Sequence, residues 1–152
     1  MTLGLLDIRD AALGHAQASG WFDRVIGHEP KNAPGDGLTL ALWVDGFQPI
    51  PARSGLTATS ARIGLSARLY MPMLHEPQDE IDPTLLSAAD QLIADYSGDF
   101  TLGGLVAQVD LLGAHGEPLG GRAGYLEHDG KVFRVFALAV PLIVNDLWEQ
   151  AP

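Results

Sequence analysis

The chain has 152 residues, of which 47% are hydrophobic, a size and composition typical of one globular domain over residues 1–152 rather than a disordered chain. Its 19 acidic residues outnumber the 9 basic ones and give a formal net charge of −10, which disfavours attraction to a nucleic-acid backbone. Cysteine is absent, which excludes disulfides, thiolate metal sites and cysteine nucleophiles.

The first residues of the chain lack the features of an export signal. They reach Asp7 and Asp10 without a basic leading region or a cleavage-like tail. No apolar run in the sequence approaches the ~20 residues that a membrane helix needs. We therefore expect the protein to be made in the cytoplasm and to have no membrane partner.

A helical spacing of apolar residues predicts a first helix over residues 3–18. Thr2 is the expected N-cap and Gly20 the expected stop. A short strand at 24–26 follows. Glycine and proline then predict an irregular loop over 27–37.

Two strands are predicted next, at 38–47 and 57–71. The second alternates strictly between apolar and other side chains, which places its apolar set toward the core. Together the two strands predict a long antiparallel hairpin with its tip at 49–55. Arg62 and Arg68 share one face of the second strand, where they either pair with acidic residues of a neighbouring subunit or remain solvated.

A second helix is predicted over residues 83–97 and ends at Gly98. Asp82 is the expected N-cap, with Pro83 at the first helical position. Asp79, Glu80 and Asp82 lie just before this helix, where carboxylates interact favourably with the helix dipole. That role explains the cluster better than a cation site does, because its spacing matches no cation-binding loop.

Three more strands are predicted, at 104–112, 119–127 and 131–144, with a tight turn at 128–130 between the last two. Strands linked as hairpins, with helices segregated from them, indicate an α+β fold. The expected architecture is a mostly antiparallel sheet flanked by two main helices, with a long β-hairpin.

The last strand is apolar on both faces. Between 132 and 144 it carries a single charge, Arg134, among valine, phenylalanine, leucine and isoleucine. Such a strand needs cover on both sides. The helices of this chain supply one cover, and a neighbouring subunit is the expected source of the other.

Residues with catalytic or ligand-binding chemistry form no recognisable constellation. The five histidines are too widely spaced for a local zinc site. The glycine-rich loops at 27–37 and 113–121 do not open helices or carry a Lys-Ser or Lys-Thr pair, and no G-x-S-x-G elbow occurs. We therefore expect a protein that is not an enzyme and has no metal, no cofactor and no catalytic residue.

Several segments, in order along most of the chain, resemble one family. They are GHEPKNAPGDGLTLALWVD (27–45), LYMPMLHEPQDEIDPTLL (69–86), YSGDFTLGG (96–104), VDLLGAHGEPL (109–119), AGYLEHDGKVFRV (123–135) and PLIVND (141–146). The sequence resembles the tail terminator proteins of long-tailed, siphovirus-type bacteriophages, in the form common among phages of actinobacteria. These motifs are structural in character and contain no catalytic signature.

The resemblance implies a virion structural protein in the neck of the phage. Family members form a homohexameric ring at the head-proximal end of the tail tube, stop tube polymerisation and offer a docking surface for the head connector. The implied partners are other copies of this chain, the tail tube protein and the head connector or stopper protein. DNA would pass through the ring without sequence-specific binding, and the acidic composition would repel it.

Contacts within such a ring are expected at the hairpin tip, at the loop 113–120 and at the end of the chain. Trp148 follows the last strand on a polar tail, where it contacts either another subunit or its own core. Trp43 is expected to pack on a sheet face. The candidate interface residues are Ile50, Arg53, Leu56, Arg62, Arg68, His115 and Trp148.

Two other readings stay open. One is a different neck component, a stopper or connector-completion protein, which the sequence alone does not separate from a terminator. The other is a small-molecule-binding α+β domain, which would require a pocket with converging polar groups.

Overall fold

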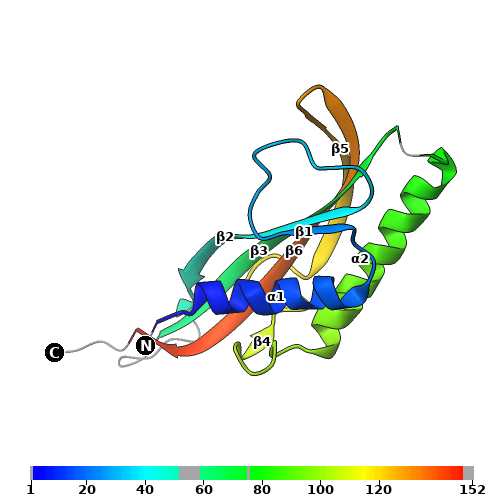
Figure 1. Cartoon of the computed structure of the whole chain (residues 1–152). Coiled ribbons are helices and arrows are strands. Elements are labelled where there is room, and N and C mark those ends of the chain that lie inside the picture. Colours follow the sequence, from blue (N-terminus) through cyan, green and yellow to red (C-terminus); the bar gives the residue numbers. More distant parts are fainter. Residues whose placement is uncertain (1, 52–58, 75, 149–152) are drawn as a thin grey trace.

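The computed structural model describes residues 2–51, 59–74 and 76–148. Within them the fold is α+β, with two α-helices packed on one face of a six-stranded sheet (Figure 1). Along the chain the elements are α1 (Leu5–Ser19), β1 (Arg24–Ile26), β2 (Thr39–Pro49), β3 (Thr59–Pro72), the 3₁₀ turn η2 (Gln78–Glu80), α2 (Ile81–Gly98), β4 (Gln108–Val109), β5 (Gly120–His128) and β6 (Lys131–Leu147). The predicted fold class is confirmed.

The sheet has the strand order β1-β2-β3-β6-β4. Strand β3 pairs along nearly the whole length of β6, so β4 and β5 share the other edge of β6. The β1–β2 pair is parallel and the other four pairs are antiparallel. Strands β2 and β3 form the long hairpin that the alternation predicted, although most of its tip, residues 52–58, lies outside the described residues.

Helix α1 begins later than predicted. Its N-cap is Gly4, which has a left-handed conformation with a φ of 69°, so the prediction of Thr2 as N-cap is wrong. The predicted stop is confirmed, because Gly20 caps the other end with a φ of 77°, a conformation that glycine adopts without steric cost.

Helix α2 begins earlier than predicted, at Ile81, because the 3₁₀ turn η2 runs directly into it with Glu80 at the N-cap position. Asp82 therefore lies inside the first turn and is not the N-cap. Its carboxylate instead accepts a hydrogen bond from the Arg134 guanidinium of β6 at 3.0 Å. The single charge within residues 132–144 thus ties β6 to the beginning of α2.

The main core lies between the helices and the sheet. The alternating residues of β3 point into it, and the register sets Leu65 between Val44 of β2 and Val140 of β6. One buried cluster joins both helices to β2, β3, β4 and β6. The helices are also joined directly, since the Tyr96 hydroxyl donates to the Ala12 carbonyl at 2.9 Å.

The predicted strand at 104–112 is reduced to the two residues of β4. Residues 99–107 form turns instead, with Leu102, Gly103 and Gly104 at positive φ, a backbone region that a strand does not use. The predicted tight turn between β5 and β6 is confirmed. Asp129 and Gly130 have φ values of 52° and 76°, as a type I′ turn requires.

Candidate assembly surface

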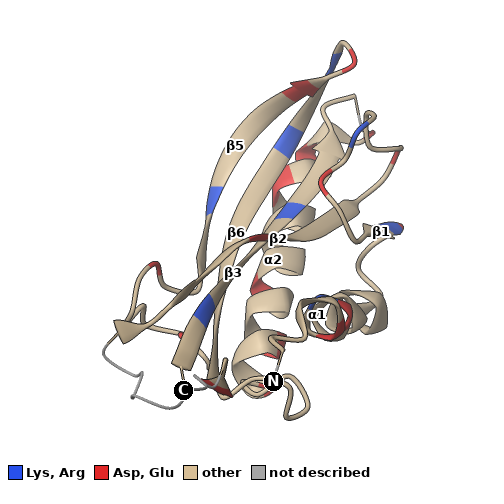
Figure 2. Cartoon of the chain, turned by 90° about the vertical axis from the view of Figure 1, so that its left-hand side faces the viewer, with Lys and Arg blue, Asp and Glu red and all other residues tan. Residues whose placement is uncertain are grey.

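The face of the sheet opposite the helices carries no helix in the described part of the chain (Figure 2). The strand register aligns its side chains in cross-strand rows. One row runs Ala41, Arg68, Ala137, Arg122 across β2, β3, β6 and β5, and the next runs Trp43, Ser66, Ala139, Gly120. We call this surface the helix-free face.

One end of the helix-free face is covered by the loop that follows β1. Tyr70, Phe133 and Val135 are buried there against Ala33 of the loop. The rings of Tyr70 and Phe133 meet edge to face at 6.1 Å, and burial raises the pKa of the tyrosine. The Ala33 amide donates to the Asp129 carboxylate at 2.8 Å and so ties the loop to the β5–β6 turn.

The other end is covered by the loop between β4 and β5. Asp110, 3% exposed, accepts the Ala114 amide at 2.8 Å and the His115 amide at 3.1 Å. Its carboxylate also pairs with the Arg62 guanidinium at 3.2 Å, and Arg62 donates in addition to the Glu117 carbonyl. Burial alone would raise the pKa of Asp110, but the two amides and the guanidinium outweigh it and hold that pKa below its usual range.

Between these covers lies an exposed area that we call the central patch. It is formed by Trp43, Ser66, Arg68, Arg122, Ala137 and Ala139 of four strands and by Glu117 of the loop between β4 and β5. Ala137 and Arg122 are exposed. The guanidinium of Arg68 lies over the Trp43 ring at 5.3 Å from its centroid and donates to the Tyr70 hydroxyl at 3.3 Å, contacts that hold it in place. Within the described residues neither Arg68 nor Arg122 forms an ion pair.

Less of the last strand is uncovered than its two apolar faces predicted. Loops of the same chain bury Phe133 and Val135 at one end of β6 and Ile143 at the other. Only the middle of the strand, around Ala137, is left uncovered on this face. Among the described residues, the part of this face of β6 that the chain leaves uncovered is therefore limited to the central patch.

The structure changes the interpretation of three predicted interface residues. Ile50 is 5% exposed and its amide donates to the Ser60 carbonyl, so its side chain is not available as a surface contact. Arg62, at 12% side-chain exposure, is neither solvated nor directed to a neighbour, because Asp110 and Glu117 hold it. His115 belongs to the loop that makes this contact.

The remaining candidates have different positions. Arg68 lies on the same face as Arg62, as predicted, and belongs to the central patch. Trp148, 37% exposed, packs its ring on Phe47 of the same chain at 6.4 Å between centroids. Trp43 lies on a sheet face as predicted. Arg53 and Leu56 lie outside the described residues.

The sequence analysis did not single out Arg122, Ala137 or Asp110. A signal for the first two was present: Gly120, Arg122 and Gly124 alternate along one face of β5, and Ala137 and Ala139 are the smallest residues of an otherwise bulky strand. The sequence carried no signal for Asp110, since its partner Arg62 is 48 residues away.

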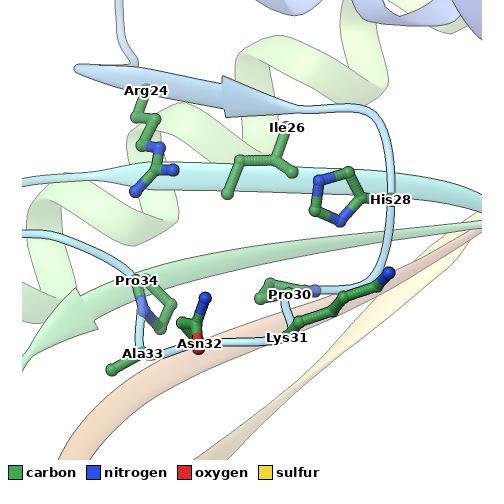
Figure 3. Close-up of a pocket in the computed structure, with 8 residues that line it drawn as sticks. All are labelled: Arg24, Ile26, His28, Pro30, Lys31, Asn32, Ala33 and Pro34. Carbon is green, nitrogen blue, oxygen red and sulfur yellow. The ribbon is translucent and has the colours of Figure 1, made fainter.

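A hollow of about 250 Å³ lies between β1 and the loop that follows it (Figure 3). Arg24, Ile26 and His28 line it from the side of β1, while Asn32 and Pro34 line it from the loop. His28 already bonds within the loop, with its Nδ1 at 2.9 Å from the Glu29 carbonyl. The lining of this hollow thus combines cationic and apolar groups without a carboxylate or a hydroxyl.

Within the described residues no group of three or more histidine and acidic side chains is arranged to hold a metal ion. Neither described helix combines the length and apolar character needed to cross a bilayer. Scans of the chain against models of known protein families and against curated protein sequences return no match.

Proposed function

We propose that this protein is a structural virion protein that forms a ring at the head-proximal end of a phage tail tube. In this role it ends tube polymerisation and provides the surface on which the head connector docks. It acts without catalysis and without a cofactor.

The observation that carries this proposal is the central patch on the helix-free face. A small α+β domain gains stability by covering both faces of its sheet, and here the described residues leave the middle of one face uncovered. The position of the resembling segments supports the same role. The segments 27–45 and 109–119 contain the two loops that cover the ends of this face, and 123–135 and 141–146 supply most of β5 and β6.

The charge of the chain is compatible with a ring around DNA. At −10 per copy, an assembled ring would repel the phosphate backbone and let it pass without adhesion. The proposed location is the neck of the virion, with other copies of the chain, the tail tube protein and the connector or stopper as partners.

The test is electron microscopy of particles made from a phage genome that lacks this gene. A terminator predicts tails of uncontrolled length, or tube ends that do not join filled heads, and a copy of the gene supplied in trans restores joined particles. Tails of normal length beside heads that lose their DNA would assign the protein to the stopper role instead. Normal infectious particles would overturn a role in the neck.

A further inference from the structure

Two arginines of the central patch, Arg68 and Arg122, have no ion-pair partner among the described residues. In the β-sheet register Arg68 of β3 and Arg122 of β5 both stand opposite Ala137 of β6, one on each side. Neighbouring strands lie ~4.8 Å apart, so the two arginine backbones are about 10 Å apart with an exposed methyl group between them. Both arginines line the same hollow of the central patch, so a carboxylate that enters it would interact with two cations.

The outer side of α2 has the opposite charge. The helix carries Asp82, Asp90 and Asp95 and no basic residue. Asp82 is already bound to Arg134, and Asp95 accepts a hydrogen bond from Gln91. Asp90 is exposed and has no ion-pair partner among the described residues.

The residues around Asp90 permit close approach. Pro83, Leu86, Ser87, Gln91 and Ala94 are exposed with it along one stripe, which we call the α2 ridge. Leu86 is 54% exposed. Asp82 stands at the start of the same stripe but is paired with Arg134, so Asp90 is the unpaired carboxylate among the exposed residues of this stripe that the structure describes. Its neighbours are uncharged, as in the core of a protein interface, where charges are few.

We infer that the α2 ridge of a second copy of this chain docks on the central patch, with its Asp90 carboxylate between Arg68 and Arg122. The inference rests on the proposed function and specifies its subunit contact. In one molecule the patch and the ridge lie on opposite sides of the sheet (Figure 2). Each docked copy therefore leaves one patch and one ridge free, and such a head-to-tail contact continues until a ring closes.

The experiment measures the mass of the assembly by light scattering and native mass spectrometry. The patch variant carries Arg68→Ala and Arg122→Ala, and the ridge variant carries Asp90→Arg. We expect wild-type protein to form a closed oligomer and either variant alone to be monomeric, with the dissociation constant raised by about 10- to 100-fold or more. An equimolar mixture of the two variants should stop at a one-to-one dimer, because only one intact patch and one intact ridge remain.

Matched controls separate this contact from general charge effects. Asp7→Arg makes the same charge change on an exposed position of α1, and Arg24→Ala removes an exposed arginine from the edge strand β1, so both should assemble like wild type. Combining Arg122→Glu with Asp90→Arg in one chain should restore assembly. Circular dichroism confirms that every variant is folded.

Wild type that oligomerises while both variants assemble unchanged would overturn the inference and leave the ring proposal standing. Wild type that stays monomeric throughout the concentration series would also overturn it. The role in the neck is tested separately, by electron microscopy of particles made without the gene. Variants that assemble normally but no longer cap tail tubes would also overturn the inference. They would indicate that the central patch binds the tail tube protein rather than a second copy of this chain.

Discussion

Thr39 of β2 is fully buried, and its hydroxyl has no hydrogen-bond partner within the described residues. Burying an unpaired hydroxyl costs about 1–3 kcal/mol. We therefore expect Thr39→Val, which keeps the shape and removes the hydroxyl, to raise the free energy of unfolding by about 1 kcal/mol in urea denaturation. Thr39→Ser is the control: it keeps the hydroxyl, loses a buried methyl group and should destabilise the protein. A valine variant less stable than wild type would mean that the hydroxyl is bonded.

Asp110 holds the second loop of the helix-free face in place, and its role depends on pH. Its pKa is lower in the folded chain than in the unfolded one, so its contribution to stability is complete above about pH 4 and is lost as pH falls through the folded-state pKa. Asp110→Asn leaves Arg62 without its charged partner and should cost about 2–4 kcal/mol at neutral pH.

Urea denaturation of Asp110→Asn and wild type at neutral pH and near pH 3 checks this expectation. The difference between the two proteins should shrink as pH falls below about 4, because the stabilisation by the Asp110 carboxylate is lost as it takes up a proton. Asp36→Asn, at an exposed position, should follow wild type at both values. A difference that stays constant with pH would show that the charge of Asp110 is not what stabilises the loop.

Between elements, the contact of the two helices depends on Tyr96. Its ring is fully buried, its hydroxyl donates to the Ala12 carbonyl of α1, and burial raises its pKa above the usual range. Tyr96→Phe should lower the free energy of unfolding by about 1–2 kcal/mol because it removes this hydrogen bond within the core. Tyr125→Phe, at a position 65% exposed, should change it by less than about 0.5 kcal/mol. Equal effects of the two changes would contradict a special role for the helix contact.

The order and type of most elements could be predicted from the sequence because periodicity and caps are local signals. The alternation of β3, the stripe of α2 and the Asp129–Gly130 turn are examples. The beginning of α2 was missed because Asp82 suits an N-cap as well as it suits a partner for Arg134, and only tertiary contact decides between them. The strand expected at 104–112 is limited to Gln108–Val109, because Gly104 has positive φ and turns or bends occupy 104–107 and 111–112.

The candidate surface could be predicted from the sequence only in part. The alternation showed that Arg62 and Arg68 share a face, but it did not show that Asp110 binds one and leaves the other for the central patch. Equally, the flanking of Ala137 by Arg68 and Arg122 depends on the register of three strands. Register is set by the whole sheet rather than by any single segment.

At the scale of the whole molecule, charge is separated between the layers. The charged residues of helix α2 are all acidic, whereas Arg62, Arg68 and Arg122 stand on the helix-free face. The acidic residues of β2, β5 and β6 lie away from the central patch: Asp45 at the bulge of β2, Glu127 beside the β5–β6 turn and Asp146 near the end of β6. In a chain with a strong net negative charge, the central patch places two arginines beside the single carboxylate of Glu117, and this local positive excess favours the approach of an acidic surface of a second copy.

The continuous core predicts that the molecule unfolds as one unit. Both helices and four strands contribute to a single buried cluster, so the loss of either layer exposes the other. Trp21 lies beyond α1, Trp43 on the central patch and Trp148 after β6, so tryptophan fluorescence reports on three separate regions. In urea we expect the fluorescence and the far-ultraviolet circular dichroism to share one midpoint. The free energy of unfolding should fall with urea concentration at about 1–3 kcal/mol/M. Repeating the measurement at two protein concentrations separates unfolding from dissociation, which alone shifts the midpoint with concentration. A helical signal lost well before the fluorescence change would mean that the helices and the sheet fold as separate units.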